Sequence, residues 1–428
     1  MKKKYIILFL NIYGIGGAQQ YLSNKTSFLK KKGFEVFVFS GNNNMNNLVL
    51  IDSLKGFEKG VFPPLMFSPI FSRRIQISKI IEEIKKSISF HPNDVCYIES
   101  NAIATAEWGE ILAKEIKGKH ILFNLQEQHN YSKEEIDFLR FKFNRKELSG
   151  IVKTSLQDML KDKSIQFEDW MRISACCNNV VADCEDKFSD LLWKDADLTF
   201  GTIGRLDKEC VLPVLEGILE YIIKNPGRKY NVVIIGGGRR ITVKKIKNLL
   251  DSHSNINLII TDYIYPIPRS LLKNIDVFIS TAGSATVSFN ENRPTIKVHP
   301  VKGHSVGILG YTFVAGKSSM YDPPTISLPE TIRQIINEKD KIVYRDNSAD
   351  SYEGKMIAEF DRQLSFFELS NEDSDYYNTW NIRKNSGLRT MICMIVGKFC
   401  GTKKLQILLK IDYSLRNYKK FFKFLKCN

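Results

Sequence analysis

Three short turns in this sequence combine glycine with small residues directly after apolar runs. Glycine lets a backbone approach a ligand closely, and the free N–H groups at a helix start favour an anion such as phosphate. Each turn precedes a helix-like stretch, so we expect ligand binding, with a plain tight turn as the alternative. The expected binding positions are Gly16 and Gly17 in the first turn, Gly236 and Gly237 in the second, and Gly283, Ser284, Ala285 and Thr286 in the third.

Fixed positive charge follows the apolar run Leu198–Ile203, where Arg205 and Lys208 stand close together. A bound diphosphate needs such charge, and the Arg guanidinium supplies a rigid fork of hydrogen-bond donors. We therefore predict that Arg205 and Lys208 contact phosphate. Solvated surface charges are the alternative.

Two side chains able to exchange protons follow the apolar run His120–Leu125. Glu127 can act as a general base on a hydroxyl, and His129 can do the same or hydrogen-bond a reacting group. We predict catalytic roles for both, with a solvated loop as the alternative. Glu99 ends the run Asp94–Glu99 and is a further candidate of the same kind.

Two D-x-D stretches raise the question of a metal ion. Asp195-Ala196-Asp197 precedes a strand-like run, and Asp373-Ser374-Asp375 lies in a polar stretch, so we interpret both as solvated linkers. The sequence contains no His/Cys cluster of the kind that binds zinc. We expect no metal and no other cofactor.

Apolar runs of four to eight residues alternate with helix-like stretches, and continuous apolar runs predict strands buried on both faces of a parallel sheet. The predicted strands are Tyr5–Leu10, Glu35–Ser40, Asp94–Glu99, His120–Leu125, Cys177–Ala182, Leu198–Ile203, Asn231–Ile235, Asn257–Thr261, Asp276–Ser280 and Thr295–Val298. The predicted helices are Gln19–Lys32, Thr105–Ile116, Cys210–Lys224, Thr242–Asp251, Ile267–Lys273 and Leu328–Glu338, and residues 130–176 are expected to be mostly helical.

Two such series predict an α/β protein with two Rossmann-like domains that face each other across a cleft. We place the N-terminal domain at residues 1–195, the second domain at 196–345, and a helical segment with a tail at 346–428. The chain has 428 residues, enough for two cores. Its eight cysteines form no C-x-x-C pair, which indicates buried thiols of a reducing compartment.

The positive charge is concentrated at the C-terminal end. Residues 381–428 contain 12 Lys and Arg and one acid, a net charge of +11, whereas the total is +15, so the rest of the chain carries +4. Apolar residues from Leu408 to Leu425 recur at spacings of three and four, which predicts a helix with one apolar face among basic residues. We expect this helix to lie on an anionic membrane surface; a helix packed on the body is the alternative. The nearly neutral body argues against a nucleic-acid enzyme.

The order of these motifs resembles the group 1 (GT4-like) glycosyltransferases of bacteria, which have the GT-B fold. Gly16-Gly17 with the lysine-rich stretch Lys30–Gly33 is similar to the opening of this family, and Gly204-Arg205-Leu206 resembles its G-R-L segment. The resemblance covers about residues 1–345. Two departures stand out: the lysine usual five residues beyond the arginine is Cys210, and the usual glutamate pair falls at Ile279 and Val287, with Glu291 the nearest glutamate.

The resemblance implies a hexosyltransferase that takes a nucleotide sugar on its second domain and a saccharide acceptor on its first. The basic tail suggests a lipid-linked acceptor and a cytoplasmic enzyme, peripheral on the inner face of the cell membrane. Capsule or O-antigen synthesis is the expected setting. Two alternatives stay open: a sugar-nucleotide 2-epimerase of the same fold, and a non-catalytic GT-B-like partner of another transferase.

Overall fold

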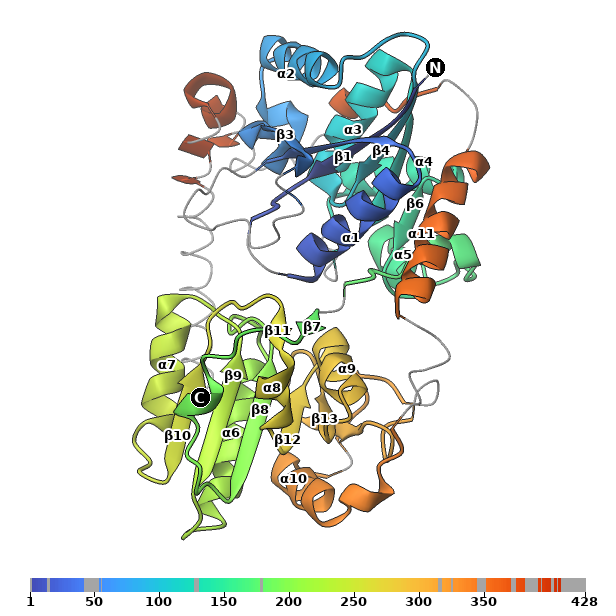
Figure 1. Cartoon of the computed structure of the whole chain (residues 1–428). Helices are drawn as coiled ribbons and strands as arrows, with labels where there is room; N and C mark the ends of the chain where they lie inside the picture. Colours follow the sequence, from blue (N-terminus) through green and yellow to red (C-terminus); the bar gives the residue numbers. More distant parts are fainter. Residues whose placement is uncertain are drawn as a thin grey trace. The chain divides into compact units, whose positions relative to one another are not determined.

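A computed structural model describes the chain at residues 2–13, 16–41, 54, 56–126, 131–177, 180–314, 318–324, 326–344, 352–370, 375–381, 392–393, 395–401, 404–405 and 407–408. The chain forms two compact units (Figure 1). Unit 1 contains residues 1–14, 18–176 and 352–428, and unit 2 contains residues 15–17 and 177–351. The domain boundaries expected at 195/196 and 345/346 stay a prediction.

Unit 1 is built on a parallel sheet of six strands in the order β3-β2-β1-β4-β5-β6. This is the doubly wound strand order, in which β2 and β3 are added on one side of β1 and the later strands on the other side. The strands are β1 (Lys3–Phe9), β2 (Glu35–Ser40), β3 (Glu58–Val61), β4 (Val95–Ser100), β5 (Lys119–Asn124) and β6 (Leu148–Gly150). The helices are α1 (Gly17–Lys31), α2 (Arg74–Ser87), α3 (Ile103–Ile116), α4 (Lys133–Asn144), α5 (Ser155–Leu160) and α11 (Tyr352–Leu369).

Local sequence signals explain where these elements begin and end. Helix α1 is followed by Gly33, whose φ is 82°, a left-handed conformation that glycine adopts without strain. Helix α4 starts with a capping box, in which the Ser132 hydroxyl accepts a hydrogen bond from the Glu135 N–H. Helix α2 buries one face through Ile77, Ile80 and other isoleucines at helical spacing.

Unit 2 repeats the plan with a second sheet in the order β10-β9-β8-β12-β13-β14, parallel except for β14. Its strands are β8 (Leu198–Ile203), β9 (Tyr230–Ile235), β10 (Ile256–Ile260), β12 (Val277–Ser280), β13 (Thr295–Val298) and β14 (Ser305–Ile308). Its helices are α6 (Val211–Ile223), α7 (Arg240–Leu250), α8 (Arg269–Lys273), α9 (Ala282–Asn290) and α10 (Leu328–Asn337), and a small separate pair joins β7 (Val181–Ala182) to β11 (Ile267–Pro268).

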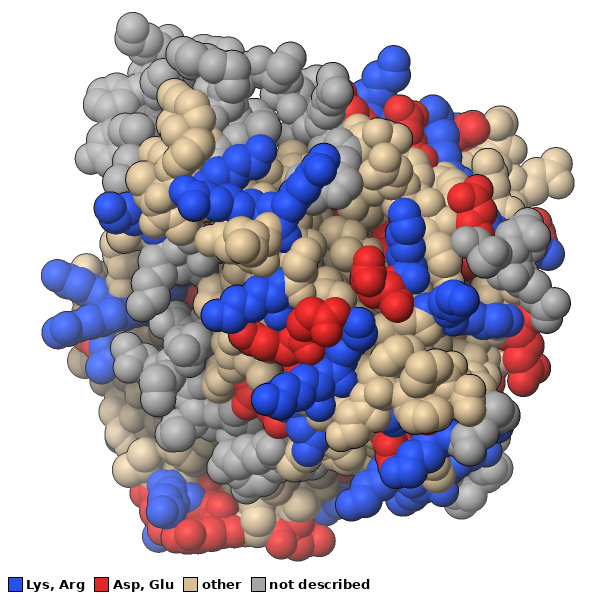
Figure 2. Space-filling view, turned by 90° about the horizontal axis from the view of Figure 1, so that it is seen from above, with Lys and Arg blue, Asp and Glu red and all other residues tan. Residues whose placement is uncertain are grey.

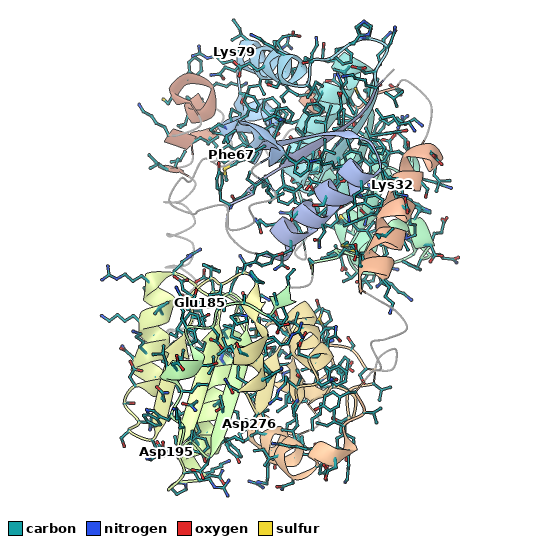
Figure 3. All side chains as sticks on the ribbon, viewed as in Figure 1. Lys32, Phe67, Lys79, Glu185, Asp195 and Asp276 are labelled. Atoms are coloured by element: carbon teal, nitrogen blue, oxygen red, sulfur yellow. The ribbon has the colours of Figure 1, made fainter. Side chains whose placement is uncertain are left out.

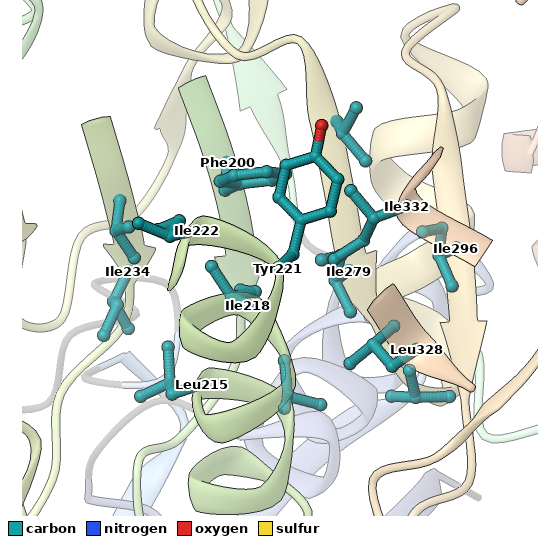
Figure 4. Packing of buried hydrophobic residues seen from close by; sticks show 14 of the residues in the cluster. Phe200, Leu215, Ile218, Tyr221, Ile222, Ile234, Ile279, Ile296, Leu328 and Ile332 are labelled. Atoms are coloured by element: carbon teal, nitrogen blue, oxygen red, sulfur yellow. The ribbon is translucent and has the colours of Figure 1, made fainter. Parts of the chain in front are cut away.

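The core of unit 2 lies between the sheet and helices α6 and α10 (Figure 4). Phe200 of β8 and Ile218 of α6 are almost fully buried there, together with Ile332 of α10. Gly217 lets α6 and α10 approach closely, because a Cβ at this position would lie 2.6 Å from the Leu328 side chain. This packing holds the strand ends in fixed positions.

The described residues of the C-terminal part of the chain pack into unit 1. Phe367 of α11 is buried and contacts the rings of Tyr5, Tyr97 and Phe123. Farther on, the N–H of Tyr377 donates a 2.9 Å hydrogen bond to the Glu110 carboxylate. The described helices include none that is both long and apolar enough to cross a membrane.

The structure corrects several predicted elements. Of the strand expected at Cys177–Ala182, only Val181–Ala182 is described as a strand, and it pairs outside both main sheets. The stretch 130–176 contains strand β6 besides its helices, and the helix expected at Ile267–Lys273 begins as strand β11. These strands are too short to show a period in the sequence. The tail helix expected at 408–425 lies outside the described residues apart from Leu408.

Candidate functional site

The carboxyl ends of β8, β9 and β12 lie side by side in unit 2. Strand β8 pairs with both others, and its register, continued past the last paired residues, puts Gly204 between Gly236 and Thr281. The Ile203 N–H donates a 3.0 Å hydrogen bond to the Ser280 hydroxyl, which fixes β8 against β12 at this level. Ligands of open α/β sheets bind at this edge.

The Gly236–Gly238 turn after β9 fits tightly between its neighbours. Gly236 has a φ of 149°, and a Cβ on it would lie 2.1 Å from the Gly204 carbonyl oxygen. A Cβ on Gly237 would lie 2.0 Å from the Asp262 carboxylate. Packing between the adjoining loops therefore explains why these positions hold glycine, and their expected role in donor binding stays a prediction.

Arg205 is exposed at this edge, and its guanidinium forms no ion pair or hydrogen bond with any residue that the structure describes, whereas its backbone carbonyl accepts a 3.2 Å hydrogen bond from the Lys208 N–H. Lys208 is half-buried, and its ammonium lies 3.9 Å from where a Gly204 Cβ would stand. Between them, the Asp207 carboxylate accepts a 3.2 Å hydrogen bond from the Arg239 N–H at the start of α7. The Arg205 guanidinium and the Lys208 ammonium thus lie beside one turn. Of the three charged groups, only the Asp207 carboxylate already has a hydrogen-bond partner among the described residues.

Cys210, at the position where the resembled family usually has lysine, is buried in the unit 2 core. Burial raises the pKa of its thiol. This side chain offers no charge to a ligand, so any second cation at this turn has to come from Lys208.

Helix α9 begins directly after β12, and its first turn carries a polar group with no partner. Thr281 is the N-cap residue, but its side chain caps nothing. Its hydroxyl oxygen, Oγ1, is buried and has no hydrogen-bond partner among the described residues, and the residue as a whole is 5% exposed. A buried unpaired hydroxyl costs about 1–3 kcal/mol. Such a group at a helix N-terminus fits a site that a ligand completes.

The backbone around Thr281 is also shaped for ligand binding. Ala282 has a φ of 49°, in the left-handed region that alanine rarely adopts. Gly283 is exposed and Ser284 half-buried, and the N–H groups of a helix's first turn have no partner within the helix. Of the predicted positions in this turn, Ala285 differs: its side chain is fully buried and can only contribute packing.

The positions expected for the glutamate pair hold core residues. Ile279 belongs to the main unit 2 core (Figure 4), and Val287 is buried in a second cluster with Phe278. Glu291 follows the last residue of α9, at the opposite end of that helix from Thr281, and it pairs with Arg269. None of the three side chains can therefore serve a ligand at the first turn of α9.

His299 extends this edge and was not among the predicted site residues. It follows β13, the strand next to β12, and the register continues to place it beside Ala282. Its Nδ1 accepts 3.1 Å hydrogen bonds from the Val301 and Lys302 N–H groups. The neutral ring must therefore carry its proton on Nε2, and desolvation and the nearby His304 and Lys302 lower its pKa. In the sequence, the position of His299 directly after a buried strand is the feature that could have indicated a role in ligand binding.

The first D-x-D stretch lies at the opposite end of the sheet (Figure 3). Asp195 pairs with the Lys229 side chain, and Asp197 accepts a 2.8 Å hydrogen bond from the Lys229 N–H, so both carboxylates join the starts of β8 and β9. Of the second stretch, 373–375, only Asp375 is described. Among the residues that the structure describes, no group of three or more His, Cys, Asp and Glu side chains could hold a metal ion.

The predicted residues of the first half of the chain are only partly described. Gly16 and Gly17 lie at the start of α1, after β1 in the chain. Glu127 and His129, predicted to be catalytic, lie outside the described residues, as does the rest of 127–130. Glu99 is buried, and its carboxylate accepts hydrogen bonds from Tyr5 at 2.6 Å and Tyr21 at 2.8 Å. This engagement makes Glu99 a structural residue rather than a base.

Comparison with known proteins supports the architecture. No family model matches the sequence, and no curated protein matches it. Among solved structures, a glycosyltransferase from Rickettsia africae is 12% identical with a TM-score of 0.53, over 86% of this chain and 98% of that chain. A putative UDP-N-acetylglucosamine 2-epimerase from Listeria monocytogenes is 13% identical with a TM-score of 0.50, over 88% of this chain and 100% of that chain.

The chain has the GT-B fold. Its two Rossmann-like units confirm the predicted fold class and the GT-B resemblance. At identities of 12% and 13% the likeness shows the fold alone, and it extends to transferases and epimerases alike. The chemistry has to be argued from the residues of the site.

Unit 2 of this GT-B protein thus has a candidate anion site, in which three neighbouring strands are each followed by a donor. These are the Arg205 guanidinium after β8, the Thr281 hydroxyl with the first N–H groups of α9 after β12, and the His299 Nε2–H after β13. All three are donors with no acceptor aimed at them from the described residues. A phosphate group is the ligand chemistry that such a set favours.

Proposed function

We propose that this protein is a glycosyltransferase that moves a sugar from a nucleoside-diphosphate donor to an acceptor hydroxyl, with the diphosphate on unit 2. The observation that carries the proposal is the buried, unpartnered Thr281 hydroxyl at the start of α9, one strand away from Arg205. A phosphate oxygen would accept its hydrogen bond and remove the cost of leaving it unpaired.

The proposed chemistry assigns one task to each group. The acceptor oxygen bonds to the anomeric carbon of the donor sugar as the bond from that carbon to the diphosphate breaks. The negative charge that develops on the leaving diphosphate is stabilised by Arg205, by Lys208 and by the N-terminus of α9. The acceptor's proton passes to a base, for which we propose Glu127, with His129 as the other candidate. Fixed charges replace a metal ion in this scheme.

The charge distribution supports the choice of acceptor. Residues 381–428 carry a net charge of +11, which suits a protein that works at the inner face of a bacterial cell membrane. A lipid-linked saccharide is anchored at that surface, so we propose it as the acceptor, in the synthesis of a surface polysaccharide such as capsule or O-antigen. Localisation in the cytoplasm, peripheral on the membrane, is part of the same proposal.

A sugar-nucleotide 2-epimerase is the second candidate, because the fold is also similar to the Listeria monocytogenes structure. An epimerase changes the free nucleotide sugar with no acceptor present, whereas a transferase needs the acceptor. A non-catalytic partner is the third, because Ile279 and Val287 replace the expected glutamates with core residues. That reading requires that no nucleotide sugar binds at all.

Calorimetric titration of the protein with UDP, GDP, ADP and CDP tests donor binding directly. We expect one of the four to bind, and binding of none would reject the proposal. Turnover of Glu127→Gln and His129→Ala then tests the base: loss of the base should lower turnover and leave nucleotide affinity almost unchanged. If both variants turn over as fast as the natural protein, neither Glu127 nor His129 is the base.

A further inference from the structure

Two segments far apart in the sequence form one surface on unit 1. The first is residues 67–79, which include the start of α2, and the second is the described part of 392–408. Phe71 of the first packs with Cys393 and Leu405 of the second, and all three are buried. The Arg73 guanidinium donates a 2.6 Å hydrogen bond to the Lys398 carbonyl oxygen. We call these two segments together the α2 patch.

The contact between the segments is close and specific. A Cβ on Gly397 would lie 2.5 Å from the Phe71 carbonyl oxygen, so only glycine allows this approach. The Arg73 guanidinium also lies 5.1 Å from the centre of the Phe399 ring, within the range of a cation–π interaction. The second segment is therefore a fixed part of unit 1, and its outward side chains are held in place relative to α2.

The outer side of the α2 patch carries large apolar side chains that no described residue covers. Ile75 is 76% exposed and Phe399 is 71% exposed. Ile407, Ile395 and Ile392 are 57%, 53% and 43% exposed. Single exposed apolar residues are ordinary on a soluble protein, but a group of five on two adjoining segments indicates a binding surface.

Basic residues outnumber acids on these two segments, and the nearby acids Glu82 and Glu83 follow in α2, where the Glu83 carboxylate lies 3.9 Å from the Lys79 ammonium. Residues 67–79 and 392–408 contain no Asp or Glu. They contain six basic residues, which are Arg73, Arg74, Lys79, Lys398, Lys403 and Lys404. Figure 3 places Phe67 and Lys79 on this part of unit 1, and Figure 2, which views the molecule from that end, shows Lys and Arg spread over the face with Asp and Glu among them.

We propose that the α2 patch docks on an anionic lipid surface, with Ile75 and Phe399 inserted among the headgroups and the cations facing lipid phosphates. Exposed apolar side chains beside an excess of cations suit this partner, because acyl chains accommodate the apolar side chains and anionic headgroups attract the cations. The chain continues past Leu408 into residues 409–428, which hold six more Lys and Arg and one acid. The tail would thus leave the body at the surface that the patch contacts.

This inference rests on the membrane location within the proposed function and is independent of the transfer chemistry. Its test is co-sedimentation of the full chain with vesicles of phosphatidylglycerol and phosphatidylcholine, compared with phosphatidylcholine alone. One unit of charge at such a surface changes binding about fivefold. Ile75→Glu adds one negative charge and removes an inserted side chain, so we expect at least a tenfold loss of binding to anionic vesicles, and the same for Phe399→Glu.

Ile223→Glu is the matched control, because Ile223 is 58% exposed in unit 2 and lies outside the patch. Its binding to anionic vesicles should fall by no more than about fivefold, which is the loss that the added charge alone explains. Nucleoside diphosphate affinity is measured on all three variants and should stay unchanged, which separates failure of this inference from failure of the proposed function. If Ile75→Glu and Phe399→Glu bind vesicles as Ile223→Glu does, the inference is wrong. It is also wrong if they lower the melting temperature by several degrees, because the tail would then cover these side chains.

Discussion

Thr281→Val separates a ligand-binding hydroxyl from a structural one. Valine keeps the shape of threonine and removes only the polar group. Replacing an N-cap threonine usually destabilises a protein by about 1 kcal/mol, but the Thr281 side chain caps nothing and its Oγ1 has no partner in the described structure. The substitution should therefore leave the free energy of unfolding unchanged or raise it by up to about 1–3 kcal/mol, the cost of the unpaired hydroxyl.

Nucleotide binding should change in the opposite direction. A hydrogen bond to a charged group contributes about 1.5–3 kcal/mol, which corresponds to roughly a 10- to 150-fold loss of affinity. Thermal unfolding with and without nucleoside diphosphate measures both effects in one assay. Thr281→Val should melt at or above the temperature of the natural protein without nucleotide and gain less from added nucleotide.

Thr295→Val is the control within the same sheet. The Thr295 hydroxyl is buried and lies 2.9 Å from the Ser288 hydroxyl and 2.8 Å from the Arg293 carbonyl oxygen, so its loss leaves buried groups unpaired. This variant should lose about 1–3 kcal/mol of stability and keep its nucleotide affinity. The reasoning is refuted if Thr281→Val behaves like Thr295→Val, with lower stability and unchanged binding.

Four further predictions follow from the same structure. Arg205→Ala should weaken nucleoside diphosphate binding by about 1.5–3 kcal/mol and Lys208→Ala by less; titration of both checks this, and equal affinity in Arg205→Ala contradicts it. Burial and the Lys142 ammonium lower the pKa of His120 from 6.5 to about 4, so the unfolded state takes up a proton first as pH falls. The free energy of unfolding should therefore decrease by up to roughly 3 kcal/mol as the pH falls from 6.5 to about 4. Denaturant titrations that show no change in this free energy over that pH range would refute the prediction. Donor binding should survive EDTA, and a loss restored by Mg²⁺ or Mn²⁺ would assign a metal to the site. A chain ending at Leu408 should fold and bind nucleotide normally but bind anionic vesicles more weakly than the full chain; equal vesicle binding would exclude a role for the tail.

A chain ending at Glu372, before the basic region, is not suitable for the vesicle test. The structure shows that residues beyond 372 complete unit 1. Tyr377 bonds to Glu110 and packs on Phe138, and Leu405 is fully buried against residues 67–71. Removal of this stretch would open the core, so loss of function in that shorter chain would not report on membrane binding.

The sequence predicted the fold well where strands are long and buried. Leu198–Ile203 and Thr295–Val298 match β8 and β13 residue for residue, because continuous apolar runs between turns have one plausible structure in an α/β chain. Short or polar elements escaped: β14 contains Ser305 and Gly307, and α2 shows its apolar face only through spaced isoleucines. The α2 patch could not be foreseen, since it joins segments from near the two ends of the chain.

The candidate site was predicted in part. Gly283 and Ser284 lie where the sequence indicated, at the start of a helix after a buried strand, and Arg205 is exposed on the neighbouring strand's turn. The sequence did not show that Thr281, just before them, holds an unpaired hydroxyl, because partners of a side chain depend on the neighbouring strands. It also could not show that the neighbouring loops leave no room for a side chain in the Gly236–Gly238 turn.

Product analysis tests most directly whether this GT-B protein transfers a sugar. The full chain is incubated with labelled nucleotide sugars, with and without membranes that contain lipid-linked saccharides, and both phases are analysed. The proposal predicts label in the lipid fraction and an equal amount of free nucleoside diphosphate, both dependent on the acceptor. Conversion of the free nucleotide sugar into its C2 epimer without any acceptor would contradict it and identify an epimerase.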